Sequence, residues 1–296
     1  MSLLGTRVVR VEDPDLLTVG GKYVDDLAPA DSVYATFVRS PMAHAEIVDI
    51  DASDALEIPG VLGVFTAADL DLPANPPSMP MLHQEMRRTR LATDRVRYVG
   101  EPVAVVVSET AAAGADAVDA ILVDYEPLPA VVTTADSVTN ETLLFPGAGT
   151  NVVFAGPSQA GDDFFDGCEV TVDLEFTNQR VAPCPLEVRA AAARWDDVDG
   201  TPRLTQWSST QGAHGTRDTL AAAAGVDESQ VRVICPDVGG GFGAKNGGYP
   251  EDVVVALLAR ELDRPVRWVE SRSESMLGLV HGRGCDFTAT IGGDRD

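Results

Sequence analysis

The stretch Val231–Lys245 constrains this chain most, because it places four glycines within five positions directly after a predicted strand. The segment reads VRVICPDVGGGFGAK, and only Phe242 interrupts the glycines. Glycine loses more backbone entropy on ordering than any other residue and has no side chain to pack. One glycine is enough for a tight turn. Four of them predict a close approach of backbone N–H groups to a ligand, which is typically an anion.

Two nucleotide-binding patterns can be compared with this segment. Gly239, Gly241 and Ala244 satisfy the dinucleotide pattern G-x-G-x-x-G/A after a strand. That pattern requires a helix to begin on the glycines, whereas NGGYP separates them from the helix predicted to start at Pro250. The P-loop pattern fails because no Ser or Thr follows Lys245. A dinucleotide-dependent oxidoreductase therefore remains only as an alternative.

The charge balance excludes some classes of partner. The 296 residues include 22 basic and 46 acidic side chains, which gives a net charge of −24, and only Lys22 and Lys245 are lysines. Such a field repels nucleic acid and anionic membranes, so we expect neither as a partner. A high-salt cytoplasm and an ordinary acidic cytosolic protein are both compatible with this composition.

The sequence also bears on location and redox chemistry. No apolar run reaches the roughly 20 residues of a membrane span, and the first residues have no signal-peptide core, so we expect a cytoplasmic protein. No pair of the four cysteines has C-x-x-C spacing, which argues against a zinc site or an iron–sulfur cluster on this chain. The cysteines are Cys168, Cys184, Cys235 and Cys285.

The first half of the chain alternates predicted strands with short helices, as in an α/β or α+β layer domain over about residues 15–132. Residues 1–32 are predicted to be an extended lead-in, and 69–95 a long exposed loop. Residues 133–161 have the composition of a linker. The predicted strands are 34–39, 45–51, 61–66, 103–107 and 121–125, and the predicted helices are 54–56 and 109–118.

The second half predicts strands at 169–177, 190–195, 203–209, 231–234 and 266–269, and helices at 214–224 and 250–262. A last strand is predicted over Cys285–Ile291, followed by a hairpin turn at Gly292-Gly293-Asp294. The chain ends before a return strand. This pattern predicts a chain that is truncated relative to its fold, or one that another chain completes.

Several segments, taken together, resemble a known family. VGGGFGAK is similar to the glycine-rich loop of molybdenum hydroxylase large subunits, the family of xanthine dehydrogenase, aldehyde oxidase and aerobic carbon monoxide dehydrogenase. The segment RYVGEPVAVVVSET, with VDYEPLPAVV after an Ala-rich helix, resembles the family's α/β hammerhead domain, and SPMAHAEIVDIDASDALEIPGVLGVFTAADL resembles the opening part of that domain. The segments NQRVAPCPLEVRAAAARW, LTQWSSTQGAHGTRDTLA and RPVRWVESRSESM resemble the start of its molybdopterin-binding region. The resemblance covers nearly the whole chain in collinear order.

The resemblance implies an α+β fold with three parts. Residues 1–135 correspond to the hammerhead domain, 136–160 to a linker, and 161–296 to the first, incomplete part of the molybdopterin-binding domain. The family's large subunit continues well beyond this point, and its later part carries most cofactor contacts. The resemblance therefore implies that this chain is the N-terminal portion of such a subunit and is inactive alone.

The resemblance also implies roles for individual residues. Gln211 resembles the glutamine that contacts the molybdenum coordination sphere, so it is expected to be catalytic and to bind the cofactor. Phe242 is also expected to be catalytic, by shaping the substrate side. Gly240, Gly241, Phe242 and Gly243 are expected to bind the cofactor, as the loop that passes beside it. No protein side chain is expected to bind the metal directly, because a pterin dithiolene holds it.

Three neighbouring residues have weaker assignments. Lys245 is expected either to reach a phosphate or to be solvated. Glu187 and Arg189 are expected to form a structural ion pair near the site, without a role in the chemistry.

The family oxidises carbon monoxide, aldehydes or N-heterocycles with water as the oxygen source. Its cofactor is molybdenum–molybdopterin, in some members as the cytosine dinucleotide. Electrons leave through 2Fe–2S clusters on a small subunit to FAD on a medium subunit. The resemblance thus implies three partners: the C-terminal part of the large subunit, the FAD subunit and the 2Fe–2S subunit. A non-catalytic remnant that binds partner subunits is the remaining alternative.

Overall fold

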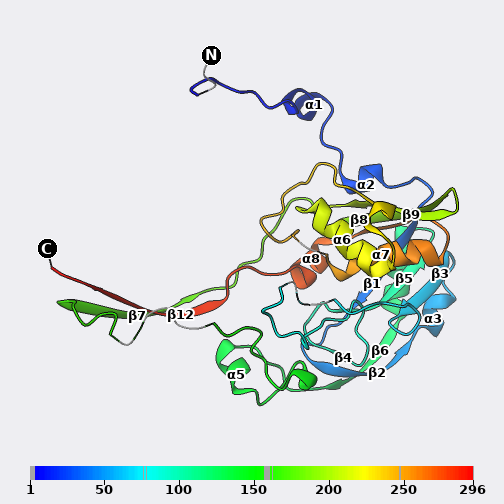
Figure 1. Ribbon diagram of the computed structural model, residues 1–296. Helices are drawn as coiled ribbons and strands as arrows, with labels where there is room; N and C mark the ends of the chain where they lie inside the picture. The colour runs from blue at the N-terminus through cyan, green and yellow to red at the C-terminus, as the bar shows by residue number, and fades with distance from the viewer. Residues whose placement is uncertain are drawn as a thin grey trace.

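The computed structural model describes residues 4–75, 77, 79–156, 161, 163–246 and 248–295 (Figure 1). Its centre is a seven-stranded sheet with the order β10-β9-β8-β11-β1-β5-β3. In that order the strands are β10 (Val231–Ile234), β9 (Thr201–Ser208), β8 (Ala190–Val198), β11 (Val266–Val269), β1 (Val33–Arg39), β5 (Pro102–Ser108) and β3 (Val61–Thr66). The predicted α+β fold class is confirmed.

This sheet crosses the predicted boundary between the two halves. β1 from the first half pairs in parallel with β11 from the second, with Val33 opposite Val266 and Tyr34 opposite Arg267. Antiparallel pairs extend the sheet on both sides, from β1 to β5 and from β11 to β8. The two predicted domains therefore share one sheet, and the division at residues 135 and 160 stays a prediction.

One helix supplies much of the core. α7 (Pro250–Glu261) begins with proline at its first turn, as the sequence predicted, and its residues from Val253 to Ala259 are all buried. It packs on β8 and β11 and beside α6 (Ala213–Ala224), which ends at the left-handed Gly225. A helix that is apolar on all sides must be covered on all sides, and here the sheet and α6 cover it.

The first half adds a second layer. A three-stranded sheet has the order β4 (Arg95–Val96), β2 (Ala45–Asp51) and β6 (Leu122–Pro127). Two helices, α3 (Ser53–Leu56) and α4 (Ala111–Ala120), pack between β3, β5 and β1. β5 is buried at every residue, as its unbroken apolar run predicted.

Several local predictions were wrong. The lead-in, expected to be extended, contains α1 (Asp13–Thr18) and α2 (Val24–Leu27). The segment predicted as a linker contains α5 (Thr134–Thr139) and the 3-10 turn η1 (Pro146–Ala148), and its role as a linker stays a prediction. The expected exposed loop at 69–95 buries Met86, Leu91 and Ala92. Two further short elements were not predicted, the 3-10 turn η2 (Glu228–Gln230) and the helix α8 (Arg272–Gly278). The second has a capping box between Ser271 and Glu274, a pattern that was readable in the sequence.

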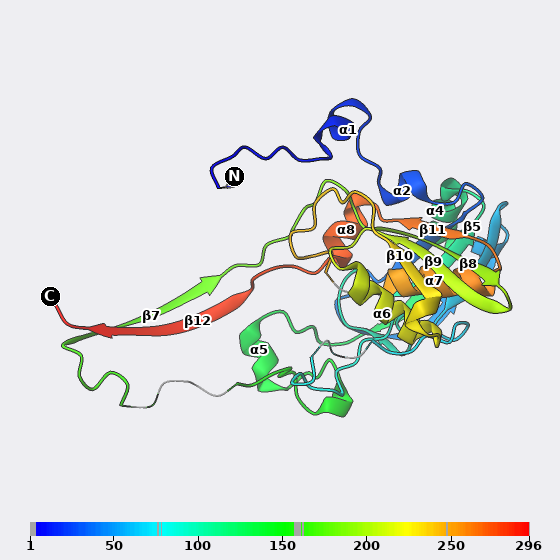
Figure 2. The same ribbon diagram turned by 45° about the horizontal axis from the view of Figure 1, so that its top comes forward.

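The last predicted strand was expected to lack a partner strand within this chain, and this expectation was wrong. β12 (Cys285–Gly293) pairs antiparallel with β7 (Val170–Asn178), and the two form a ribbon that extends away from the main body (Figures 1 and 2). Gly292 and Gly293, expected in a turn, continue the pairing opposite Thr171 and Val170. Among the described residues, no helix is long and apolar enough to cross a membrane.

Because the buried side chains of α7 belong to one core cluster with residues from both halves of the chain, shortening one of them is expected to destabilise the whole fold. Leu258 is completely buried, and Leu258→Ala should lower the free energy of unfolding by about 2–5 kcal/mol. Leu186 is 95% exposed, so the control Leu186→Ala should change it by less than about 0.5 kcal/mol. Urea denaturation followed by circular dichroism measures both. Equal midpoints for the two variants would contradict the central position of α7.

Candidate functional site

The glycine cluster and Gln211 each follow a strand that ends at the same edge of the main sheet. β9 and β10 are parallel neighbours, with Trp207 opposite Ile234 near their carboxyl ends. Gln211 follows the end of β9, and the glycines follow the end of β10. Ligands of open α/β sheets commonly bind in this position, outside the carboxyl ends of parallel strands.

Direct hydrogen bonds join Gln211 to the glycine segment. Its side-chain Oε1 accepts from the backbone N–H of Gly243 at 2.9 Å and of Lys245 at 3.2 Å. Its own backbone N–H donates to the Lys245 carbonyl at 2.8 Å. A Cβ on Gly241 would lie 2.4 Å from Gln211 Oε1, so only glycine leaves room for the amide. The structure thus brings together the two elements that the sequence singled out.

The same contacts orient the amide of Gln211. Two backbone donors occupy Oε1, which leaves the NH₂ group to face away from the segment. Within the described part of the chain, Nε2 of Gln211 has no protein acceptor. Gln211 is exposed. It therefore presents a hydrogen-bond donor to whatever lies outside this edge of the sheet.

Three consecutive backbone N–H groups face no protein acceptor. Among the described residues, Gly240, Gly241 and Phe242 donate no hydrogen bond to the protein. The backbone here is unusual, with φ of +102° at Gly240, +52° at Phe242 and +85° at Gly243. Successive N–H groups in such a conformation form a concave, donor-lined surface that suits an anion.

The side chain of Phe242 lies outside the core. It is 74% exposed, so it is not an ordinary core aromatic. A non-glycine residue with positive φ is uncommon, and strained backbone of this kind clusters at functional sites. Phe242 therefore stands beside the free N–H groups with its ring available to a ligand.

Lys245 is neither solvated nor free to reach a phosphate, so both expectations for it were wrong. Its side chain is fully buried, and Nζ donates to Glu187 Oε2 and to the Glu187 carbonyl, each at 2.8 Å. Burial lowers the pKa of Lys245, although Glu187 opposes the shift. Oε2 of Glu187 also accepts from Gly239 N and from Ser209 Oγ, both at 2.8 Å. The Lys245–Glu187 pair therefore anchors the start and the end of the glycine segment.

The expected pair between Glu187 and Arg189 is also wrong, because Arg189 binds other carboxylates. Its guanidinium contacts Glu270 at 2.6 Å and Glu251 at 3.1 Å, and it lies 4.1 Å from the centroid of the Tyr249 ring. Arg189 is separated in the chain from Glu251 by 62 positions and from Glu270 by 81 positions. Sequence reasoning missed this cluster because its members meet only through the sheet and α7.

The first turn of α7 carries two carboxylate side chains, Glu251 and Asp252. Burial favours the neutral form of Glu251, but Arg189 and Arg39 outweigh it and lower the pKa of Glu251 below its ordinary value. The next residue, Asp252, accepts from Ser208 Oγ at 2.7 Å. These carboxylates fill the helix end that would have to receive a pyrophosphate in a dinucleotide site, so the structure disfavours that alternative.

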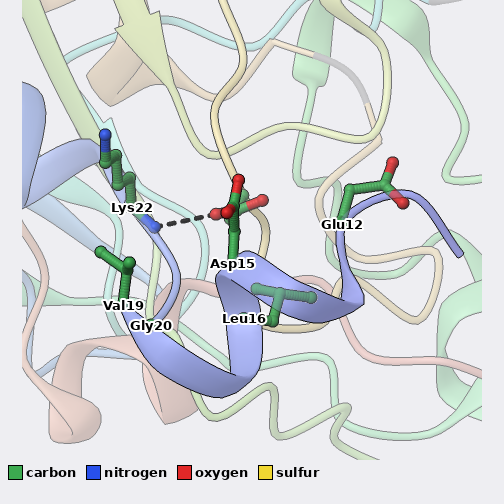
Figure 3. A pocket seen from close by; sticks show the side chains of 7 residues that line it. Glu12, Asp15, Leu16, Val19, Gly20 and Lys22 are labelled. Carbon is green, nitrogen blue, oxygen red and sulfur yellow. Dashed lines mark hydrogen bonds between the residues drawn. The ribbon is translucent and has the colours of Figure 1, made fainter.

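A hollow on the surface lies elsewhere, between α1 and the segment before the glycines. The backbone N–H of Lys22 donates to Asp237 Oδ2 at 2.8 Å (Figure 3). The residues that line this hollow are mainly acidic or apolar, and they include neither Gln211 nor the glycine cluster at 239–243. The lining residues are Glu12, Asp15, Leu16, Val19, Gly20, Lys22 and Asp237. Within the described part of the chain, no group of three His, Cys, Asp or Glu side chains is placed to hold a metal ion.

Comparison with known proteins identifies the family. The model of the molybdopterin cofactor-binding domain matches residues 144–296, more than half of the chain. The α/β hammerhead domain of aldehyde oxidase and xanthine dehydrogenase matches residues 18–129. This chain belongs to the family of molybdenum hydroxylase large subunits. The resemblance found in the sequence is therefore confirmed.

Individual relatives agree with this assignment. The chain is 38% identical to the nicotine 6-hydroxylase large subunit of Paenarthrobacter nicotinovorans over 95% of its own length and 35% of that protein. It is 35% identical to the carbon monoxide dehydrogenase large chain of Afipia carboxidovorans, over 99% of this chain and 38% of that one. The crystal structure of quinoline 2-oxidoreductase from Pseudomonas putida 86 superposes with a TM-score of 0.87 at 34% identity, covering 98% of this chain and 37% of that one. The chain thus spans just over a third of these relatives.

Replacing Lys245 removes its buried ammonium group and should make the backbone of the glycine segment more mobile. Lys245→Met keeps the alkyl chain but leaves Glu187 with only its Gly239 and Ser209 donors, so we expect a loss of about 3 kcal/mol in the free energy of unfolding. The amide of Gly239 should also exchange faster with deuterium. The matched control is Lys22→Met, because Lys22 is the other lysine and is exposed. If both variants exchanged at the same rate, Lys245 would not anchor the segment.

Asp252 should make stability depend on pH in a defined direction. Burial raises the pKa of Asp252 from its ordinary value of 3.8 to about 6. The folded state holds the proton of Asp252 more tightly than the unfolded state does. The stabilisation of the folded state that results is therefore present below pH 4 and is lost as the pH rises through 6. The neutral variant Asp252→Asn lacks this dependence. Its stability relative to the parent should rise by about 3 kcal/mol between pH 4 and pH 7.5.

Denaturant titrations of both proteins across that range provide the measurement. The difference between variant and parent cancels the titration of the other carboxylates. A difference that stays constant with pH would show that folding does not raise the pKa of Asp252.

Proposed function

We propose that this chain forms part of the catalytic large subunit of a molybdenum-dependent hydroxylase or dehydrogenase. The observation that carries the proposal is the single wall formed by Gln211 and the segment Gly240–Gly243 at the carboxyl ends of β9 and β10. Membership of the family supports it. Because the chain spans just over a third of its relatives, the activity belongs to a larger assembly.

The residues of this wall fit an anionic, oxygen-rich cofactor. The N–H groups of Gly240, Gly241 and Phe242 and the amide of Gln211 are all donors, and they are free within the described residues. No carboxylate of the described residues is hydrogen-bonded to any of these donors. Oxo and phosphate oxygens accept from such donors, so these residues and Gly243 would hold the molybdenum–molybdopterin group. When bound, this group supplies metal-centred oxidation with water as the oxygen source.

The residues of this chain would bind and orient the cofactor and shape the substrate side of the site. Gln211 offers a donor whose direction is set by the N–H groups of Gly243 and Lys245 on Oε1. A donor fixed before the reaction needs no reorganisation when charge develops next to it. The exposed ring of Phe242 would cover the substrate side and exclude water there.

The partners and substrate follow from the same proposal. The remaining C-terminal part of the large subunit would complete the site, and FAD and 2Fe–2S subunits would carry electrons away. The substrate is carbon monoxide, an aldehyde or an N-heterocycle. The cofactor is molybdenum–molybdopterin, either in its simple form or as the cytosine dinucleotide. We place the assembly in the cytoplasm. A non-catalytic remnant that binds partner subunits is the alternative, and cofactor content distinguishes the two.

Removal of the Gln211 amide tests the proposal. In the assembly purified from its host, Gln211→Ala should lower the turnover number about 100-fold, as expected for loss of one preorganised donor. The control is Gln179→Ala, because Gln179 is exposed and makes no hydrogen bond among the described residues. Molybdenum content by mass spectrometry is measured on both proteins, and the 296-residue chain alone should show no turnover.

An assembly without molybdenum or pterin would refute the proposal and favour the non-catalytic alternative. Equal turnover of the two glutamine variants would remove Gln211 from the catalytic machinery.

A further inference from the structure

The ribbon of β7 and β12 has one apolar face. Its register places Val172 opposite Ile291, Leu174 opposite Ala289 and Phe176 opposite Phe287. Directly opposed residues of an antiparallel pair lie on the same face, and so do alternate residues along a strand. The rings of Phe176 and Phe287 are stacked, with centroids 4.9 Å apart and planes 13° from parallel. We call these six residues the apolar face of the ribbon.

The other face is polar and forms its own hydrogen bonds. Thr290 Oγ1 donates to Asp173 Oδ1 at 2.7 Å, and Thr177 Oγ1 donates to Asp286 Oδ1 at 2.8 Å. Asp286 also accepts from Thr134 of α5. These bonds stabilise the ribbon and leave the polar face suited to water.

Nothing in the described part of the chain covers the apolar face. Figure 2 shows the ribbon lying outside the main body. A two-stranded ribbon is at best marginally stable in water by itself, and a contiguous exposed apolar surface marks an interaction site. The five large side chains of this face are Val172 (59% exposed), Leu174 (55%), Phe176 (46%), Phe287 (43%) and Ile291 (73%).

We propose that the apolar face of the ribbon is the docking surface for the part of the large subunit that the relatives carry outside their match to this chain. This inference rests on the proposed function and names the surface by which the two parts assemble. The occupant is an apolar helix or sheet layer, since a sheet with one apolar face is stable when another layer covers it. Among the described residues, the sheet of the ribbon contains only β7 and β12, so both of its outer edges are also open to further strands.

Two observations favour this occupant over a second copy of the chain. The matched relatives are much longer, and this chain covers only 38% of the carbon monoxide dehydrogenase large chain. Two copies of this chain would bring two net charges of −24 together. Such like-charge contact disfavours self-association.

Neighbouring cysteine substitutions can report the two faces separately. Ala289→Cys places a thiol on the apolar face, and Thr288→Cys places one on the polar face of the same strand. The probe is the segment of the Afipia carboxidovorans large chain that follows its match to this chain, joined to residue 296 in a single chimeric polypeptide. Alkylation is measured by peptide-resolved mass spectrometry, which separates these thiols from the native cysteines.

We expect alkylation of the cysteine at 289 to be about tenfold slower in the chimera than in the 296-residue chain, because the thiol is covered there. The cysteine at 288 should change by less than about twofold, since water still reaches it. Phe287→Lys should restore fast alkylation at 289 in the chimera, whereas Thr288→Lys should not. Circular dichroism of each variant shows whether it folds.

Equal alkylation at 289 in the folded chimera and in the 296-residue chain would overturn the proposal. Protection that rises with concentration in the 296-residue chain alone would also overturn it, because a second copy would then be the occupant. Neither measurement involves molybdenum. A protected face in an assembly without the cofactor therefore refutes the proposed function alone, and an open face in a molybdenum-loaded assembly refutes only the docking surface.

Discussion

The parallel pairing of β1 with β11 is the contact on which the rest of this structure depends. It joins strands that are more than two hundred positions apart and so makes one sheet from both halves of the chain. α7 packs on β8 and β11 of that sheet, and its buried side chains belong to one core cluster with Val33, Ala35 and Phe37 of β1. Arg39 of β1 reinforces the junction through Glu251, which also binds Arg189. Three buried charges are stable together because each one is paired, and removing any one would leave a buried charge uncompensated.

The candidate site uses this frame to hold its donors in place. β9 and β10 end at the same edge, and the side chain of Gln211 then ties the two following segments together. Behind them, the buried pair of Lys245 and Glu187 satisfies Gly239 and fixes the path of the glycines. The side-chain oxygen of Gln211 thus accepts two hydrogen bonds inside the protein, while its amide NH₂ and the N–H groups of Gly240, Gly241 and Phe242 have no acceptor among the described residues. This asymmetry is what suits the surface to an anionic cofactor.

Local patterns in the sequence predicted the elements that carry the site. The apolar run of β5, the proline at the start of α7 and the glycine after α6 each determine a local structure through short-range sterics or solvation. The glycine cluster and its similarity to a known loop also identified Gln211 as its companion. Lys245 shows where this reasoning stops. Its acidic partner is 58 positions away in the chain, so no local signal could reveal a buried pair. The partner of β12 was hidden for the same reason.

The sequence by itself determined the family, the fold class and which residues meet at the end of β9 and β10, because collinear motifs and glycine content depend on residue order alone. Only the tertiary structure decided that Lys245 is buried, that Arg189 binds Glu251 and Glu270, and that the first turn of α7 is closed to a nucleotide. It also decided that an amphipathic ribbon leaves its apolar face uncovered. These features depend on which distant segments share a surface, and the free energy of burial acts on that shared surface rather than on sequence neighbours.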